Sequence, residues 1–278
     1  MVDNKISVIT VCFNCGGLIE RTIKSVIDQT YANVQYIIID GGSTDNTLNI
    51  IKKYENKINV VVSEKDGGIY DAMNKGIEYA TGDLIYFLNA GDYLCNNNVL
   101  RSVIEELNAN PTSDIIYGDY IYYDDHSEQQ CSGYRAGIPS LFCKGYCHQT
   151  LFAKKSTFIK CGTFNTDYSI CADLDWLLRA LVKFRQKMSY IDIPIAYYLK
   201  GGASEIHVDK YSYERIEIIQ KTVGYQGLFS FAISHPTSFC VYLLILLKNK
   251  KKLAEMHEIE TSAGILSIDS KNAEKNKP

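Results

Sequence analysis

Single carboxylates follow short apolar runs at two places in this sequence, a spacing typical of a ligand site at the edge of a sheet. Asp40 ends YIIID, and Gly41 and Gly42 after it let a ligand approach the backbone closely. Asp92 ends FLNAGD, after a second apolar run. The first carboxylate can accept hydrogen bonds from a base or a sugar hydroxyl, and the second is an oxygen ligand that suits Mg²⁺ or Mn²⁺. A strand-turn-helix junction and a turn Asp are the plainer alternatives.

The stretch SEKDGGIYDAMNKG adds a charged group that could flank the same ligand. Asp66 lies in its glycine-containing loop, and Asp71 and Lys75 follow on an expected helix. Asp71 and Lys75 are four residues apart and share a helix face, so a surface ion pair is the alternative interpretation.

CADLDWLLR places Asp173 in the first turn of another expected helix. A carboxylate there can act as general base on an acceptor hydroxyl, or it can simply be favoured by the helix dipole. His148 and Gln149 open a further expected strand, where a lone histidine is more often structural.

Alternating apolar patterns predict the elements that position these residues. Near-continuous Ile and Val in the strands of the first half, with short links to amphipathic helices, indicate a parallel sheet with helical crossovers. In such sheets, ligands bind at the carboxyl ends of the strands. The expected strands are 6–12, 34–40, 58–64, 83–89, 114–125, 148–155 and one within 187–204 broken at Pro194; the expected helices are 18–29, 43–54, 69–80, 171–184 and 208–222.

Composition and charge exclude some classes of protein. The net charge of −3 and the pI near 6.0 argue against a general nucleic-acid binder, which needs a basic face. The first residues, MVDNKISVITVCFN, lack the apolar core of a signal peptide, and nine cysteines in apolar contexts fit a reduced cytoplasm. We therefore expect a cytoplasmic location.

The chain divides by pattern into a domain and two C-terminal segments. Residues 1–225 are expected to form the domain, with a regular first half in 1–110 and a less regular second half in 111–225. Residues 226–255 are apolar, interrupted at Pro236 and end in lysines, which predicts either a core helix or a helix on the membrane surface. Residues 256–278 are expected to be a disordered tail.

Cysteine spacing offers other interpretations. Cys12 and Cys15 form a C-x-x-C pair between a strand and a helix, the placement of a thioredoxin-like redox motif. Zinc held by these two with Cys143, Cys147 and His148 is also conceivable, although C-x₃-C-H is poor spacing for a structural site. No G-x-G-x-x-G or P-loop pattern is present, which argues against dinucleotide oxidoreductases and P-loop nucleotidases.

In order along residues 5–200, the motifs ISVITVCFN, YIIIDGGSTDNT, EKDGGIYDAMNKG, GDLIYFLNAGD, CHQTLF and ADLDWLLR resemble those of bacterial family-2 glycosyltransferases. The resemblance implies an α/β fold: the three-layer α/β/α A-type nucleotide-diphospho-sugar transferase fold, with a mostly parallel central sheet and here a C-terminal helical extension. It implies inverting transfer of a sugar from a nucleotide-diphosphate donor, with uridine the commonest nucleotide, to a glycan or lipid-linked acceptor in exopolysaccharide, capsule or lipopolysaccharide synthesis.

The same resemblance implies that 1–225 is the catalytic domain, with a nucleotide-sugar-binding half in 1–110 and an acceptor-binding half in 111–225. It also implies roles for individual residues. Asp173 matches the catalytic base, and Asp92 stands at the last position of the motif that binds Mn²⁺ or Mg²⁺. The remaining donor-site candidates are Thr10, Asn14, Asp40, Gly41, Asp66, Asp71, Lys75, Asn89, Ala90, Gly91, His148 and Gln149.

Three departures from the family pattern leave a second function open. Asp40 is followed by Gly41 where a second Asp is common, the metal motif carries the single charge of Asp92, and Ala172 replaces the Glu before the base. The alternative is a non-catalytic nucleotide-sugar-binding or scaffold protein of a polysaccharide assembly complex. The sequence does not predict the oligomeric state.

Overall fold

Four strands rich in Ile and Val form the parallel part of the sheet in the first half of the chain. The computed structural model describes residues 3–133, 147–234 and 247. Strand order here is β3-β2-β1-β4, and all three pairings are parallel, as predicted. Cys12 pairs with Asp40, and Asp40 with Ser63, so the carboxyl ends of three strands are level. These strands are β1 (Ile6–Cys12), β2 (Val34–Asp40), β3 (Val60–Ser63) and β4 (Leu84–Phe87).

The second half extends this sheet with strands of mixed direction. β8 (Leu151–Lys154) runs antiparallel between β4 and β6 (Ile115–Tyr123), and β9 (Met188–Leu199) pairs parallel with β6. The expected strand over 148–155 starts later, because residues 148–150 form a 3-10 turn, η2 (His148–Thr150). β9 continues through Pro194, where the β6–β9 register is irregular. The short strands β7 (Glu128–Cys131) and β5 (Tyr93–Leu94) pair with β6 and β9.

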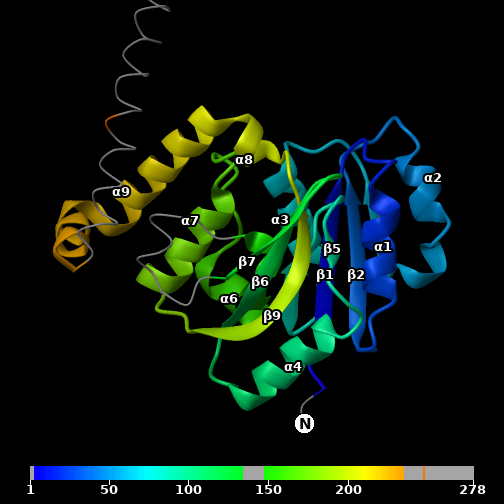
Figure 1. Ribbon diagram of the computed structural model, residues 1–278, viewed down its shortest axis with the longest axis horizontal. Coiled ribbons are helices and arrows are strands. Elements are labelled where there is room, and N and C mark those ends of the chain that lie inside the picture. Colours follow the sequence, from blue (N-terminus) through cyan, green and yellow to red (C-terminus); the bar gives the residue numbers. More distant parts are fainter. Residues whose placement is uncertain (1–2, 134–146, 235–246, 248–278) are drawn as a thin grey trace, which may run out of the picture.

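Helices cover both faces of the sheet, which gives the predicted three layers (Figure 1). The core on one face contains side chains of α1 (Ile19–Ile27), α2 (Thr47–Lys52) and α4 (Val99–Ala109). The other face is packed by α3 (Ile69–Tyr79), α6 (Lys155–Cys161), α7 (Ala172–Leu178) with the π-helical turn η3 (Arg179–Lys183), and α9 (Val208–Ser234). The single-turn helices η1 (Glu55–Lys57) and α8 (Ala203–Ile206) complete the elements of the described residues.

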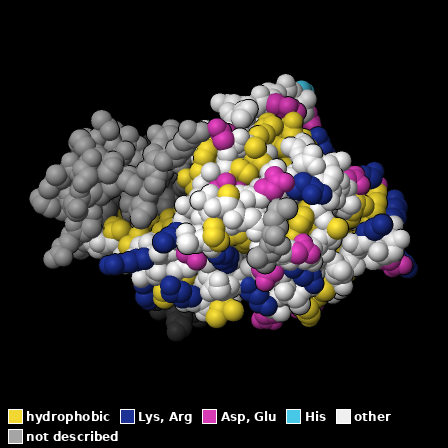
Figure 2. Space-filling view, turned by 90° about the horizontal axis from the view of Figure 1, so that it is seen from below, with side chains coloured by type: hydrophobic (Ala, Val, Ile, Leu, Met, Phe, Trp, Pro, Cys, Tyr) yellow, Lys and Arg dark blue, Asp and Glu magenta, His cyan; other side chains and the backbone are white. Residues whose placement is uncertain are grey.

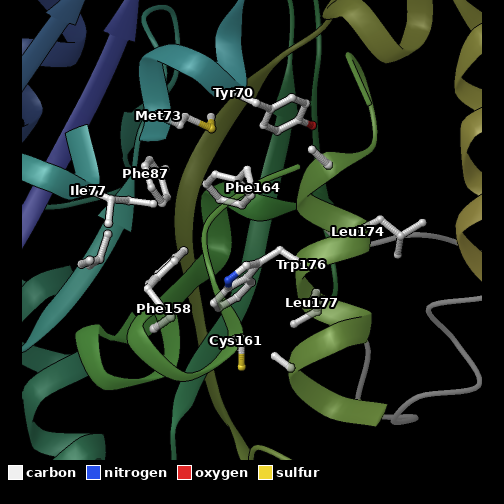
Figure 3. Close-up of a cluster of buried hydrophobic side chains, with 14 of the residues drawn as sticks. Tyr70, Met73, Ile77, Phe87, Phe158, Cys161, Phe164, Leu174, Trp176 and Leu177 are labelled. Carbon is white, nitrogen blue, oxygen red and sulfur yellow. The ribbon is translucent and has the colours of Figure 1, made fainter. Parts of the chain in front are cut away.

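Aromatic side chains fill the space between α3, α6 and α7. Phe158 stacks on Trp176 with ring centroids 4.3 Å apart, and Phe164 packs edge-on against Phe87 at 5.3 Å. Figure 3 shows this cluster, with Tyr70 at its upper end and its hydroxyl directed toward the start of α7. The cluster fixes α7 against α3, and α7 carries Asp173 in its first turn.

The surface and the C-terminal region bear on the expected partners. On the face shown in Figure 2, basic and acidic side chains of the described residues are interspersed among apolar ones. No helix in the described part of the chain is long and apolar enough to cross a membrane. α9 kinks at Gly224, and most of the expected 226–255 extension and all of the 256–278 tail lie outside the described residues.

Candidate active site

The turn after β2 is organised around the carboxylate of Asp40. This side chain is buried and accepts hydrogen bonds from the backbone N–H groups of Gly42 (3.2 Å) and Ser43 (2.9 Å). The hydroxyl of Ser43 also donates to it, as does that of Ser63 at 2.7 Å. Burial opposes the charged form, but these hydrogen bonds outweigh it and lower the pKa of Asp40 below its ordinary value. Asp40 is thus an ionised carboxylate that shapes its own turn.

Gly41 lies where the turn after β2 meets the loop after β3. A Cβ atom at Gly41 would lie 2.5 Å from Oδ2 of Asp66, so a larger residue would displace the Asp66 side chain. Asp66 in turn accepts a hydrogen bond from the backbone N–H of Gly68 (2.9 Å). Gly41 therefore leaves room for the Asp66 carboxylate beside the turn.

Asn14 joins the end of β1 to the same turn. It adopts a left-handed conformation (φ 48°), its N–H donates to Ser43 Oγ (2.8 Å), and its Oδ1 accepts from the N–H of Thr44 (2.9 Å). Thr10 is fully buried inside β1, with its hydroxyl 3.1 Å from that of Tyr36. Asn14 therefore lies at the sheet edge, whereas Thr10 lies behind it in the core.

Asp71 and Lys75 hold the loop after β3 from the side of α3. Asp71 accepts a hydrogen bond from the N–H of Gly67 (2.9 Å). Lys75 pairs with Glu64 at 2.8 Å and with Asp71 at 3.5 Å, so the four-residue spacing does form an ion pair. These contacts fix the backbone of residues 64–68 at the sheet edge.

The loop after β4 brings Asp92 into the core. This carboxylate is 4% exposed, and it accepts hydrogen bonds from Leu199 N–H (3.0 Å) and Gln149 Nε2 (2.8 Å). Burial raises the pKa of Asp92 to about 6 despite these two donors. Asp92 therefore connects the loop after β4 to η2 and to the end of β9.

The backbone of Ala90 and Gly91 is fixed by neighbours on three sides. The N–H of Ala90 donates to Val11 O (3.1 Å) in β1. Gly91 has φ 104°, its N–H donates to Thr22 Oγ1 (3.0 Å), and its carbonyl accepts from the Tyr123 hydroxyl (2.6 Å). The loop therefore presents a preorganised backbone beside β1.

Asp173 lies at the start of α7 with hydrogen-bond donors on two sides. Oδ1 accepts from the Tyr70 hydroxyl (3.0 Å) and from Leu174 N–H (2.8 Å), and Oδ2 lies 3.1 Å from His148 Nδ1. Burial, together with the charge of Asp173, raises the pKa of Tyr70 well above its ordinary value, so the phenol stays protonated and donates. The Asp173 side chain remains 20% exposed, so a solvent-borne group can reach it.

Hydrogen bonds link the base candidate to the loop after β4. Because an ionised carboxylate only accepts, Nδ1 of His148 carries the proton toward Asp173. With the proton on Nδ1, Nε2 can accept a hydrogen bond from Asn89 Nδ2, which lies 3.0 Å away. Gln149, the next residue, reaches Asp92. The structure thus brings together Asn89, Asp92, His148, Gln149 and Asp173, while Asn14, Asp40, Gly41, Asp66, Asp71 and Lys75 form a neighbouring group across β1.

The loop after β4 carries two oxygen-bearing side chains, those of Asn89 and Asp92, that bear on metal binding. Both oxygens of Asp92 accept from protein donors, and the described residues contain no group of three His, Cys, Asp or Glu side chains that could hold an ion. Asn89 Oδ1 is buried and has no hydrogen-bond partner. Mg²⁺ and Mn²⁺ are commonly held by few protein oxygens together with substrate phosphates. The loop therefore fits a cation that arrives with a diphosphate and meets Asn89 Oδ1.

The comparison with family models decides the class of this protein. Residues 7–163 match the model of glycosyl transferase family 2, which covers more than half of the chain. The chain belongs to glycosyltransferase family 2. The family-2 segment contains β1 to β4, η2 and β8, but it ends before α7 and Asp173.

Relatives that are similar to this family-2 glycosyltransferase over most of its length are themselves named as glycosyltransferases. A PGL/p-HBAD biosynthesis glycosyltransferase of Mycobacterium bovis is 30% identical over 219 residues, which cover 76% of this chain and 83% of the relative. An uncharacterized glycosyltransferase of Mycobacterium tuberculosis is 34% identical over 185 residues, covering 63% and 68%. Both alignments support a glycosyltransferase.

Solved structures confirm the A-type nucleotide-sugar transferase fold. S. aureus TarS 1–349 in complex with UDP superposes with a TM-score of 0.63 at 19% identity, covering 79% of this chain and 65% of TarS 1–349. The mannosyltransferase PcManGT of Pyrobaculum calidifontis, in complex with GDP-Man and Mn²⁺, superposes with a TM-score of 0.62 at 15% identity, covering 94% and 80%. At these identities the likeness establishes the fold alone.

Sequence reasoning missed several residues of this site. Tyr70 lies in the first turn of a predicted helix, and the sequence around it is typical of a residue that packs in the core. In the structure its hydroxyl contacts Asp173, which is 103 residues away in the chain. Leu199 contributes only its backbone N–H, and Tyr123 belongs to a tyrosine-rich run with no distinguishing signal. Cys12 and Cys15 are free thiols, and Cys143, a member of the zinc set considered from the sequence, lies outside the described residues.

Proposed function

We propose that this glycosyltransferase transfers a sugar from a UDP-sugar to a hydroxyl of a glycan or lipid-linked acceptor, with inversion, in the synthesis of a cell-surface polysaccharide. Relatives with solved UDP and UDP-GlcNAc complexes support this donor class, and a named relative in PGL biosynthesis supports a cell-surface product. The free cysteines of the described residues support a reduced, cytoplasmic setting.

The difference in exposure among three carboxylates carries this proposal. Asp40 is fully buried and Asp92 is 4% exposed, and protein donors occupy the oxygens of both. Asp173 alone of the three keeps a solvent-accessible side chain, at 20%. A general base must reach the proton that it removes, so Asp173 fits this role best.

The proposed reaction is one displacement with Asp173 as the base. The acceptor hydroxyl gives its proton to Asp173 while its oxygen forms a bond to the anomeric carbon. The bond from that carbon to the diphosphate oxygen breaks on the opposite face, and the diphosphate leaves with the electron pair. The Tyr70 hydroxyl and His148 Nδ1–H keep the carboxylate oriented before the acceptor arrives, which lowers the entropic part of the barrier.

The donor is proposed to lie along the edge formed by the ends of β1 to β4. The nucleoside of the donor would lie at the turn after β2, beside Asn14, Asp40 and Gly41. Asp40 would act mainly by holding the turn, since its oxygens meet protein donors. The further positions proposed to flank the donor are Thr10, Asp66, Asp71, Lys75, Asn89, Ala90, Gly91, His148 and Gln149.

A divalent cation, Mn²⁺ or Mg²⁺, is part of the proposal on the donor side. Asn89 Oδ1 would be its protein ligand, and Asp92 would join only by giving up its hydrogen bond to Gln149. When bound, the cation neutralises charge on the departing diphosphate.

The test combines donor binding with turnover. UDP-GlcNAc, UDP-glucose, UDP-galactose and GDP-mannose are screened by thermal shift with and without Mn²⁺, since a bound donor raises the unfolding midpoint. UDP or GDP release is then measured for each. We expect Asp173→Asn to lose about 100-fold or more in turnover while the donor-induced shift is retained.

Asp167→Asn is the matched control, because this exposed carboxylate lies in the loop before α7. It should keep wild-type turnover. Wild-type turnover in Asp173→Asn would remove Asp173 from the base role. Donor binding by the wild type with no release from any donor would favour the non-catalytic binder.

A further inference from the structure

Helix α9 supplies a buried carboxylate that the proposed reaction does not use. Glu214 is 4% exposed, although it lies in a helix near the surface. Oε1 accepts hydrogen bonds from the N–H (3.0 Å) and the hydroxyl (3.2 Å) of Ser169. Oε2 accepts from the N–H groups of Ile170 (2.9 Å) and Cys171 (3.0 Å). Four donors from three consecutive residues therefore meet one side chain.

These donors lie directly before the helix that carries the base. α7 begins at Ala172, and the N–H groups at a helix start have no partner within the helix. A buried N–H without an acceptor is costly, so the segment needs an acceptor from elsewhere in the chain. Glu214 provides it from 43 to 45 residues further along. Asp173 follows Cys171 by two residues, so the same contact sets where the base lies.

Tyr70 holds this segment from the opposite side. Its hydroxyl carries one proton, which is shared between two acceptors, Ile170 O at 2.7 Å and Asp173 Oδ1 at 3.0 Å, so it contacts both the segment and the base. The N–H and the carbonyl of Ile170 are thus bound to different helices, α9 and α3. The peptide units that lead into Asp173 are fixed from both sides.

The packing of α9 makes Glu214 a rigid support. Ile218 and Ile219 on the following turn are buried in the core shared with α3 and α7. Cys171 Sγ lies 3.5 Å from Tyr211 O, which adds a second contact between α9 and the start of α7. The helix is thus attached through both Tyr211 and Glu214 to the segment before the base.

We propose that Glu214 is a positioning residue for Asp173: its carboxylate fixes residues 169–171 and thereby aims the base at the acceptor hydroxyl. This inference rests on the proposed base role of Asp173. Because Asp173 must meet the acceptor oxygen within hydrogen-bond reach, a small displacement of its backbone lowers the rate. A residue that only stabilised the fold would change the unfolding midpoint without a selective effect on kcat.

The kinetic test uses the full chain with Glu214→Gln, which keeps the side-chain length but replaces one acceptor oxygen by a donor NH₂. With UDP-GlcNAc as donor, we expect kcat for UDP release to fall about tenfold or more while the donor KM stays within about twofold. Glu217→Gln is the control on the same helix, since Glu217 pairs with the exposed Lys221. It should keep kcat within about twofold.

Amide hydrogen exchange tests the contact itself and does not depend on the donor. In the wild type, the amides of Ile170 and Cys171 should be protected, and Glu214→Gln should lose that protection by about tenfold or more. Amides that exchange in the wild type like those of an open loop would overturn the inference, even if the variant fails to fold.

The kinetic outcomes separate this inference from the function on which it rests. A folded Glu214→Gln variant with wild-type kcat would overturn the positioning role and leave the proposed function standing. A wild type that binds donors but releases no UDP would count against the proposed function, while the exchange experiment would still decide whether Glu214 holds residues 169–171.

Discussion

The turn after β2 and the loop after β4 each bury one carboxylate at the same edge of the sheet, yet they treat its charge in opposite ways. Asp40 accepts from two backbone N–H groups and two hydroxyls, and its pKa is lowered. Asp92 accepts from one N–H and one amide, and burial raises its pKa to about 6. Asp40 has more donors than Asp92, and burial is the largest cause of the raised pKa of Asp92, so both differences separate the two carboxylates.

The comparison explains why strand-end carboxylates of similar sequence context differ in role. An ion removed from water is tolerated when hydrogen bonds replace its hydration, and otherwise the neutral form gains. Asp40 is therefore suited to carry a permanent negative charge in its turn. Asp92 connects its own loop to Gln149 and Leu199, and its carboxyl group can be protonated or ionised near neutral pH. Neither of the two is the exposed carboxylate; that group is Asp173, in the first turn of α7.

The largest expected effect on stability follows from removing the carboxylate of Asp40, which has more hydrogen-bond donors than that of Asp92. Asp40→Ala leaves two N–H groups and two hydroxyls without their acceptor, and several of these groups are partly buried. We expect a loss of about 3–5 kcal/mol in the free energy of unfolding at pH 7, because several donors lose a charged partner together. Urea unfolding followed by circular dichroism measures it.

Asp167→Ala is the control, since this exposed carboxylate should change stability by about 0.5 kcal/mol or less. If Asp40→Ala lowers the free energy of unfolding by less than about 1 kcal/mol, the hydrogen bonds to Asp40 are not what stabilises its charged form. The contrast drawn between Asp40 and Asp92 would then be wrong.

Asp92→Asn should reveal the opposite linkage. The pKa of Asp92 is raised from 3.8 to about 6 in the folded state, so the folded protein binds this proton more tightly than the unfolded chain does. The wild type therefore loses stability through this group as pH rises from about 4 to about 7, by roughly 2–3 kcal/mol. The Asn variant lacks this loss, so its stability relative to wild type should increase over the same range.

Urea unfolding of both proteins at several pH values measures the difference. Asp40→Asn provides the contrast, because a group with a lowered pKa stabilises above its unfolded pKa, and that contribution disappears as pH falls through the folded pKa. If the difference in stability between wild type and Asp92→Asn does not change with pH, the pKa of Asp92 is the same in the folded and unfolded states, and burial does not raise it.

Local patterns in the sequence predicted the parallel strands and their edge because those features depend on near neighbours. Runs such as VQYIIID specify a doubly buried strand, and the carboxyl-end rule then places Asp40 and Asn89 at one edge. The direction of β8 was not predictable in this way, since an isolated run of four residues does not state which strand it will pair with.

The candidate site was predictable as a set of residues but not as a set of roles. Asp173, His148 and Asp92 were identified from motif order, yet the exposure that distinguishes them depends on partners far away in the chain. Tyr70 meets Asp173 across 103 residues, and Glu214 reaches the segment before α7 from α9. No spacing in the sequence encodes these contacts.

The smallest expected effect removes a single donor from Asp40. Ser63→Ala deletes the hydroxyl that donates to Asp40 Oδ2 at 2.7 Å and leaves the two N–H groups and Ser43 in place. We expect a loss of about 1 kcal/mol at pH 7, since the hydrogen bond is charge-assisted but partly exposed. The loss should shrink in acid, because a protonated Asp40 gains less from the same donor.

A double-mutant cycle with Asp40→Asn isolates this interaction from other effects of the substitution. In the Asp40→Asn background, Ser63→Ala should cost clearly less than it does in the wild type, because the charged acceptor is already gone. Equal costs in the two backgrounds would mean that Ser63 stabilises the end of β3 by another route. The lowered pKa of Asp40 would then come from the Gly42 and Ser43 donors of the turn and from the Cys12 thiol. The excess of donors that distinguishes Asp40 from Asp92 would be correspondingly smaller.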